Sequence, residues 1–381
     1  MYSEDDINSA VSAGALSAEA AESFRAYMSQ RRALPRSSEE NFRLINSFND
    51  IFVAIGIVIL LLAVGAIGQA IAGIFAPEPL YLNSLDMETY QSDRDFSQSM
   101  QAMLAGLFVA ITAWPLAEFF TRKRRMALPS IILLLAFVGG FFATVFGAGA
   151  ALGFAGKDEL GAIVVIAAGL AAAMAGYVHW KRFEVPITVA AAVGVTVISG
   201  LLALLGIAQM EVDDPPALAA VLIAGLVIFA LAMRWDISDR DRITRRSDVA
   251  FWLHLLAAPM IAHPIFALLG VTGNSVLGVS AAIGVLAVYV AFGLVALAID
   301  RRALLVSALA YVLFALGFLF ERFGAVELTF ALTALVIGSA LLSLSAFWQP
   351  IRRNVVEMLP QSVQDTLPVT QDLPLPGAAT A

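Results

Sequence analysis

Residues 234–266 read RWDISDRDRITRRSDVAFWLHLLAAPMIAHPIF and contain both kinds of segment from which this chain is built. The first part is a loop rich in Asp and Arg, the longest charged loop between apolar segments. The second part is an apolar stretch that carries two of the chain's three histidines. Similar apolar stretches joined by short loops recur on both sides. This pattern predicts an all-α fold, a polytopic transmembrane helix bundle.

The composition of the whole chain agrees with this prediction. Hydrophobic residues make up 60% and charged residues 14% of the sequence, against about 45–50% and about 25% in soluble domains. The absence of cysteine excludes disulfides, Cys nucleophiles, thiolate metal sites and iron–sulfur clusters. A span needs about 20 apolar residues. We expect about ten spans, at residues 51–75, 100–120, 129–153, 160–178, 186–208, 216–234, 249–270, 276–298, 303–320 and 328–348.

The distribution of Lys and Arg over the loops predicts the orientation. If the N-terminus is cytoplasmic, 20 of the 23 basic residues fall on the cytoplasmic side. Only Arg94, Lys157 and Arg322 fall on the other side, together with 12 acidic residues. Cytoplasmic loops of membrane proteins carry an excess of Lys and Arg. The sequence therefore predicts that both termini are cytoplasmic.

Two short segments flank the predicted bundle of residues 49–349. Residues 1–48 are expected to form a small cytosolic helical segment, with one helix ending at Gly14 and a second beginning after Ser17. We expect this hairpin to rest on the membrane domain. Residues 350–381 begin with an amphipathic helix after Trp348. Five prolines from Pro350 onwards then predict a disordered tail.

The span that follows the charged loop holds most of the candidate functional residues. Four of them share one face of a helix at about 100° per residue: Asp248, Trp252, Pro259 and His263. His254 falls on the other side, so the two histidines do not chelate one metal ion from an unbroken helix. Pro259 and Pro264 are expected to kink the helix and free backbone carbonyls.

The histidines differ in their predicted depth. His263 lies roughly 22 Å from the cytoplasmic end of its span at 1.5 Å per residue. An ionisable group at that depth is a hypothesis for a functional site. The structural alternative is a neutral imidazole that hydrogen-bonds a neighbouring helix. His254 is the second candidate, and His179, expected near the water, is interpreted as structural.

The charged loop itself has a simpler interpretation. Its aspartates at 236, 239 and 241 are spaced like the ligands of a calcium loop, but the required Gly and terminal Glu are missing. The acidic residues alternate with four arginines. We therefore predict an internally neutralised, solvated loop.

Three runs carry a resemblance to a known family: RRSDVAFWLHLLAAPMIAHPIF (245–266), AIDRRALLVSALAY (298–311) and FWQPIRRNVVEMLP (347–360). They resemble an uncharacterised family of bacterial multi-pass membrane proteins. The helix, Gly, Leu-Ser, helix arrangement at residues 14–17 is similar to the cytosolic head of a related membrane domain. This resemblance implies location in the bacterial inner membrane and no particular activity.

Two hypotheses for function remain open. One is transport of a small molecule or ion along a path lined by the span with His254 and His263. The alternative is a membrane scaffold or sensory protein that contacts a cytosolic partner through residues 1–48 or the C-terminal tail. Enzyme activity is not expected, because the chain lacks HExxH, GxSxG and paired intramembrane aspartates. We expect no cofactor, no metal and no nucleic acid, and the lipid bilayer as the main partner.

Overall fold

The computed structural model describes residues 7, 10–14, 16–24, 48–80, 86–154, 159–242, 244–271, 278–323 and 328–369. Within these ranges the regular secondary structure is helical, without strands. Ten of the described helices are long and apolar enough to cross a membrane. They are α3 (Phe48–Phe75), α4 (Met87–Ala117), α5 (Ala127–Ala151), α6 (Glu159–Phe183), α7 (Ile187–Ala208), α8 (Pro215–Ile237), α9 (Arg245–Leu268), α10 (Val279–Ile299), α11 (Ala303–Arg322) and α12 (Thr329–Ala346). The prediction of a polytopic helical bundle with about ten spans is confirmed.

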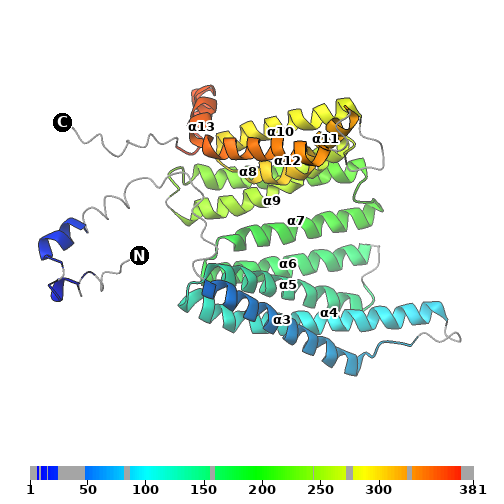
Figure 1. The fold of residues 1–381 in the computed structure, drawn as a ribbon. Coiled ribbons are helices and arrows are strands. Elements are labelled where there is room, and N and C mark those ends of the chain that lie inside the picture. Colours follow the sequence, from blue (N-terminus) through cyan, green and yellow to red (C-terminus); the bar gives the residue numbers. More distant parts are fainter. Residues whose placement is uncertain are drawn as a thin grey trace, which may run out of the picture.

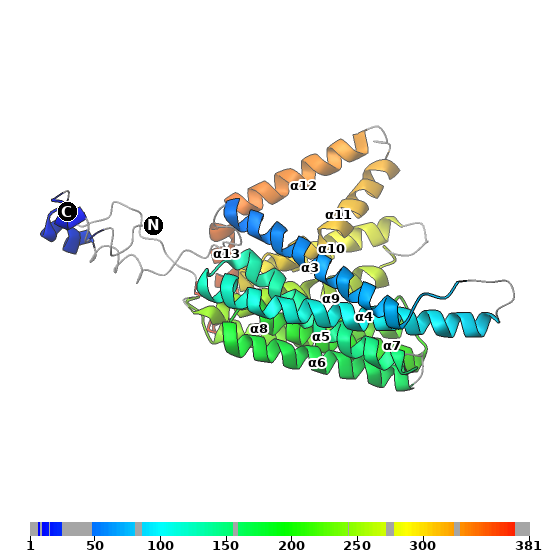
Figure 2. The same cartoon turned by 90° about the horizontal axis from the view of Figure 1, so that it is seen from below.

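The helices lie side by side (Figure 1), and from α3 to α7 they follow the chain order across the molecule, after which α9 rather than α8 is the main neighbour of α7. At one edge α3 and α4 pack together and against α5, and at the other edge α10 packs against α11. Between these edges, α9 contacts α7, α8 and α11. Of the ten helices, α9 has the largest share of buried residues and α12 the smallest. Figure 2 shows α12 diverging from the rest of the bundle.

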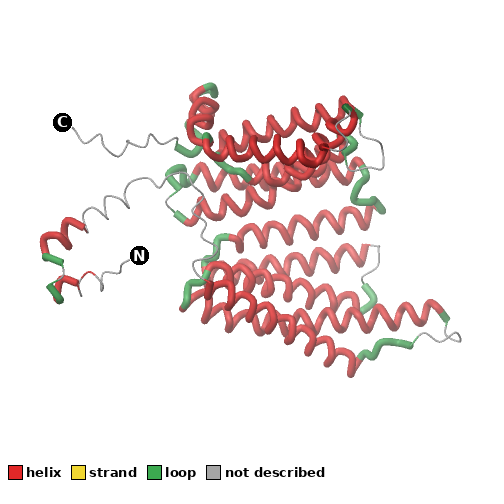
Figure 3. The backbone as a smooth tube through the Cα atoms, viewed as in Figure 1, coloured by secondary structure: helices red, strands yellow, loops and turns green. Residues whose placement is uncertain are grey.

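Short turns join the helices at one end of the bundle (Figure 3). The turns after α6, α8 and α10, and the turn after the π-helical extension of α4, η1 (Glu118–Lys123), lie at this end. That end also carries α13 (Trp348–Glu357) and α14 (Gln361–Gln364). Because Lys and Arg concentrate in these turns, we call it the basic end. Glu118 is paired there with Arg122, four residues later, at 3.3 Å and with Arg182 at 2.6 Å.

Helices α4 and α5 approach each other closely through glycines. A Cβ atom on Gly140 would lie 2.6 Å from the carbonyl oxygen of Gly106, so neither position has room for a side chain. Small residues at such contacts allow helix backbones to pack directly. Gly149 and Gly153, which have the spacing of a GxxxG motif, behave differently. Gly149 packs against Val164, whereas Gly153 follows the end of α5 with φ at +82°.

The connection between α3 and α4, at the end opposite the basic end, differs from the prediction. We expected residues 76–99 to form an acidic loop, but α4 begins at Met87 and projects beyond the neighbouring helices (Figure 1). Asp86 occupies the N-cap position and Glu88 lies in the first turn. Acidic side chains at a helix N-terminus are favourable because they face the positive end of the helix dipole. The acidic residues therefore extend α4 rather than interrupt it.

The N-terminal segment has the predicted local structure where it is described. Gly14 has φ at +71°, and the Ser17 Oγ accepts a hydrogen bond from the Ala20 backbone N–H at 3.1 Å, as an N-cap does. Residues 18–24 are helical. Both views place this segment apart from the bundle (Figures 1 and 2). The expectation that it rests on the membrane domain is therefore not confirmed.

The C-terminal segment is more ordered than predicted. The amphipathic helix after Trp348 is confirmed as α13, whose buried face consists of Trp348, Arg352 and Val356. The chain then continues through α14, and Leu367 is buried. The prediction of disorder is wrong for residues 361–369, because arginine side chains hold the backbone there. Residues 370–381 lie outside the described part of the chain.

Candidate functional site

Charged side chains from three distant segments lie together at the basic end. They come from α8 and the loop after it, from the α10–α11 turn, and from α13. We call this group the buried charge cluster, and its members are Asp236, Asp239, Arg242, Asp300, Arg301 and Arg352. Charged groups are stable away from water only when they are paired and hydrogen-bonded. The cluster contains three carboxylates and three guanidinium groups, so its formal charges balance, and most of these groups are hydrogen-bonded. Arg242 Nε and Arg352 Nε and Nη1 have no hydrogen-bond partner among the described residues.

Asp236, in the last turn of α8, is the centre of the cluster and is 1% exposed. Its Oδ1 accepts a hydrogen bond from Arg301 Nη2 at 2.6 Å, and its Oδ2 accepts from Arg301 Nε at 3.3 Å. The same Oδ2 accepts from His254 Nε2 at 3.0 Å. Arg301 Nη2 also donates to the Ser247 carbonyl at 2.9 Å. These bonds join α8, the start of α9 and the α10–α11 turn.

Asp300 links the cluster to the C-terminal segment. Its carboxylate accepts from Arg242 Nη1 at 2.8 Å and from the Trp348 indole at 2.6 Å, and Arg352 Nε lies 3.8 Å away. Arg352 Nη2 in turn donates to the Pro368 carbonyl at 2.6 Å. Burial lowers the pKa of both Arg242 and Arg352 below the usual value, and the charge of Asp300 opposes this effect.

Asp239 accepts hydrogen bonds from donor groups at the beginning of α9. Its Oδ2 accepts from the Thr244 backbone N–H at 3.1 Å, the Thr244 hydroxyl at 2.7 Å and the Ser247 N–H at 3.3 Å. The first N–H groups of a helix have no partner within the helix, so such a carboxylate stabilises it. The prediction of a solvated loop is therefore wrong at Asp236 and Asp239. It holds at Asp241, which is exposed.

The two histidines of α9 lie in different surroundings. His254 is buried and joins the charge cluster through Asp236. His263 is half-buried, and its Nδ1 lies 2.7 Å from the Tyr311 hydroxyl of α11. The other residues predicted to share its face are half-buried or exposed: Asp248, Trp252 and Pro259. That shared face is thus the more exposed side of α9, and the side of His254 faces the interior.

The two prolines do not interrupt α9. The helix is continuous from Arg245 to Leu268, with Pro264 buried and Pro259 exposed. Because proline has no N–H, the carbonyls four residues before each one receive no helical hydrogen bond from it. The predicted kink stays a prediction.

His179 lies four residues before the end of α6, and its side chain is fully buried. We expected it near the water; the structure instead covers the imidazole with protein side chains, and its depth in the membrane stays a prediction. Its ring packs among those of Phe183, Phe137 and Trp114, with centroids 4.5, 6.0 and 6.3 Å away. Neither ring nitrogen has a hydrogen-bond partner among the described residues. These aromatic contacts support its interpretation as a structural residue.

Comparison with family models, curated proteins and solved structures finds no match to this chain. Among the described residues, no three His, Asp or Glu side chains are grouped as metal ligands. The ten spans make the chain a multi-pass membrane protein, and the buried charge cluster fixes the positions of its connections at the basic end.

The sequence pointed to the segments that carry the cluster, but none of its six charged members was among the candidate functional residues; of those candidates, His254 contacts the cluster through Asp236. The runs 245–266, 298–311 and 347–360, on which the family resemblance rests, each contribute to the cluster or its contacts. Arg301 and Arg352 were counted only as basic residues near the membrane. One signal was available for Arg352, because it lies on the apolar face of the amphipathic helix, four residues after Trp348 and before Val356.

Proposed function

We propose that this membrane protein is a scaffold or sensory partner in the bacterial inner membrane, and that its basic end is a cytoplasmic docking platform. The observation that carries the proposal is the buried charge cluster. It joins the α8–α9 loop, the α10–α11 turn and the C-terminal segment through hydrogen bonds between buried groups. Moving one segment away would separate these charges and leave some of them buried without a partner, which is strongly unfavourable. The cluster therefore holds the three segments in one relative position.

The orientation in this proposal rests on the distribution of basic residues, which favours a cytoplasmic basic end and cytoplasmic termini. A cytosolic protein is the partner class that such a platform fits. It would contact the N-terminal helices or the C-terminal segment. The proposal assigns the protein no enzymatic activity and no cofactor.

Transport along α9 is the second candidate, and one observation favours it. His263 and Tyr311 form a half-buried polar pair within the spans of α9 and α11. Against this, the interior side of α9 packs against apolar side chains and the charge cluster. The cavity between α11, α12 and α13 has no lining residue from α9. The scaffold hypothesis is therefore better supported.

Complementation of a gene-deletion phenotype separates the two candidates. Leu367→Arg would displace the buried C-terminal segment, whereas His263→Gln would alter the polar pair within the membrane. The scaffold hypothesis predicts loss of function with Leu367→Arg and normal function with His263→Gln. Ser362→Arg, at an exposed position of the same segment, is the control. The opposite pattern at equal expression would contradict the scaffold hypothesis and favour transport.

Cysteine labelling tests the orientation, since the chain has no native cysteine. Ser92→Cys lies on the projecting part of α4 and should react with an impermeant maleimide in whole cells. Ser37→Cys should react only after the membrane is permeabilised. Labelling of Ser37→Cys in intact cells, without labelling of Ser92→Cys, would reverse the assigned topology.

A further inference from the structure

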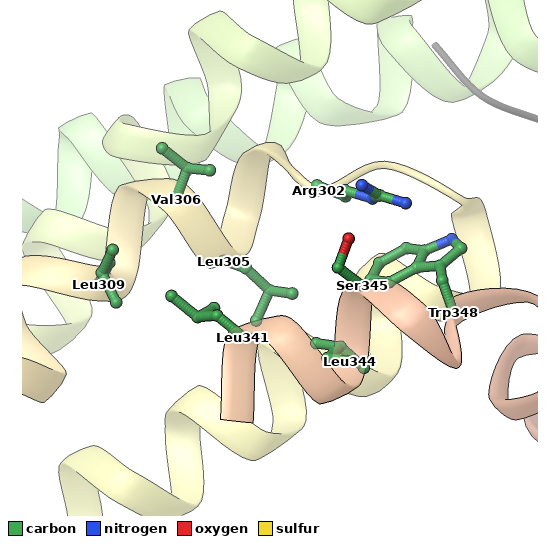
Figure 4. Close-up of a pocket in the computed structure, with 8 residues that line it drawn as sticks. All are labelled: Arg302, Leu305, Val306, Leu309, Leu341, Leu344, Ser345 and Trp348. Carbon is green, nitrogen blue, oxygen red and sulfur yellow. The ribbon is translucent and has the colours of Figure 1, made fainter. Parts of the chain in front are cut away.

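A cavity of about 180 Å³ lies between α11, α12 and α13 at the basic end (Figure 4). Its lining residues are Arg302, Leu305, Val306, Leu309, Leu341, Leu344, Ser345 and Trp348. We propose that this cavity binds an anionic phospholipid from the leaflet at the basic end. The headgroup phosphate would lie beside Arg302, and one acyl chain would follow α11 away from it.

The polar end of the cavity has a positive charge available for a ligand. Figure 4 shows the Arg302 guanidinium, the Ser345 hydroxyl and the Trp348 indole grouped at one end. The guanidinium carbon lies 4.7 Å from the centre of a Trp348 ring, and the Arg302 side chain is exposed. Stacking on an aromatic face holds a cation in place without neutralising its charge.

Arg302 differs in this respect from its neighbours at the basic end. Arg242, Arg301 and Arg352 each pair with an aspartate. Arg302 has no carboxylate within ion-pair distance among the described residues. The carboxylate of Asp300, two residues earlier, already accepts from Arg242 and from the Trp348 indole. The Arg302 guanidinium is therefore held by the Trp348 ring while its hydrogen-bond donors stay free for an anion.

The other end of the cavity is apolar. Leucines and a valine from α11 and α12 line it, and Figure 4 places Val306 and Leu309 farthest from Trp348. From Arg302 to Leu309 the helix rises about 10 Å, which is the start of the hydrocarbon region for a helix that begins at the membrane surface. An apolar cavity of about 150 Å³ is large enough to bind benzene. This cavity therefore has room for part of an acyl chain.

The position of the cavity favours a lipid over a soluble anion. Val306 is 66% exposed and α12 is the least buried of the ten helices, so the apolar end faces the bilayer. Anionic headgroups gather beside arginines at the membrane surface. A ligand that satisfies both ends must carry a negative group and a hydrocarbon chain. Phospholipids of the adjacent leaflet have this chemistry.

Native mass spectrometry of the full chain in nonionic detergent tests the proposal. The probes are phosphatidylglycerol, phosphatidylcholine with the same acyl chains, and glycerol 3-phosphate. We expect the wild-type protein to retain phosphatidylglycerol in preference to phosphatidylcholine. Arg302→Gln should weaken phosphatidylglycerol binding by about five- to tenfold, the effect of one arginine at a membrane surface. Arg302→Lys should keep most of the preference because it keeps the charge.

Two further variants make the test specific. Arg322→Gln removes an exposed arginine at the opposite end of the same helix and should leave binding unchanged. Leu309→Trp should fill the apolar end and reduce binding of both phospholipids. Thermal unfolding of every variant in the same detergent checks that the fold is retained.

Three results would overturn the proposal. One is equal retention of phosphatidylglycerol by the wild-type protein and Arg302→Gln. Another is equal loss from Arg322→Gln, which would indicate nonspecific attraction to the surface. The third is competition by glycerol 3-phosphate at the concentration of the lipid, since this would identify a site for a soluble phosphate. If Arg302→Gln unfolds, loss of the preference in a folded Arg302→Lys protein would count against the site.

Discussion

Replacing Asp236 by Asn should strongly destabilise the protein, because the change removes one charge from the buried charge cluster. Asp236 and Arg301 are 1% and 4% exposed and form two hydrogen bonds, at 2.6 and 3.3 Å. Loss of one partner leaves the other charge buried and unpaired, which costs about 3–5 kcal/mol. At about 1.4 kcal/mol per factor of ten, the folding equilibrium should shift on the order of 10²- to 4 × 10³-fold.

A double-mutant cycle separates the interaction from the substitutions themselves. Arg301→Met alone should also destabilise, since it leaves the Asp236 carboxylate without its cation. The double variant Asp236→Asn/Arg301→Met has no unpaired charge at this position. Its loss of unfolding free energy should therefore be smaller than the sum of the two single losses by about 2 kcal/mol or more.

Reversible unfolding in mixed micelles with increasing sodium dodecyl sulfate, followed by circular dichroism, measures these free energies. An exposed pair provides the control. Arg245 Nη1 lies 2.8 Å from Glu184 Oε2, but both side chains are more than half exposed. Glu184→Gln should change the free energy of unfolding by only about 0–1 kcal/mol. Additivity of the Asp236 and Arg301 variants within about 0.5 kcal/mol would refute this account of the pair.

Other contacts give matched predictions in the same unfolding assay. Gly140→Ala should destabilise by about 1–3 kcal/mol, because its Cβ would lie 2.6 Å from a carbonyl oxygen of α4. Gly139→Ala, with no atom within 4 Å, should be neutral or stabilising, and equal effects at the two glycines would contradict the close packing. Tyr311→Phe removes the hydrogen bond to His263 and should cost about 1 kcal/mol. Tyr289→Phe should cost nothing, because the Tyr289 hydroxyl is buried without a partner among the described residues; a loss equal to that of Tyr311→Phe would count against the hydrogen bond.

The spans were predictable because the length of an apolar segment is set by the thickness of the bilayer. The start of α4 was not, since acidic residues favour both a water-exposed loop and the first turns of a helix. Asp86 and Glu88 illustrate this second role. The apolar segment that follows does not show whether the acidic residues before it form a loop or the first turns of the helix.

The direction in which α9 faces could not be predicted from its sequence. The positions of Asp248, Trp252 and His263 on one side were predicted from helical geometry, and all three are half-buried. In a membrane, lipid is as apolar as the interior of the protein, so hydrophobicity does not show which side of a helix faces the other helices. His254 was ranked second because His263 was expected deeper in the membrane, and the sequence did not show that His254 lies on the interior side.

The buried charge cluster depends on contacts that no local pattern contains. Asp236 and Arg301 are 65 residues apart, and Arg242 and Asp300 are 58 residues apart. In sequence, each of these residues resembles a solvated charge near the membrane surface. Their burial follows from the packing of α13 and the residues after it over the turns, which determines where water is excluded.

A cysteine introduced at Leu367 tests most directly whether the C-terminal segment closes over the charge cluster. Leu367 is 4% exposed, packs with Ile299 and Val356, and its carbonyl accepts from Arg240 Nε at 2.8 Å. Ser362, five residues earlier, is exposed. We predict that a maleimide in detergent solution labels Ser362→Cys rapidly and Leu367→Cys at least about tenfold more slowly, because reaction at Leu367 requires local opening. Equal labelling rates at the two positions would contradict the central claim that three distant segments form one fixed, buried cluster.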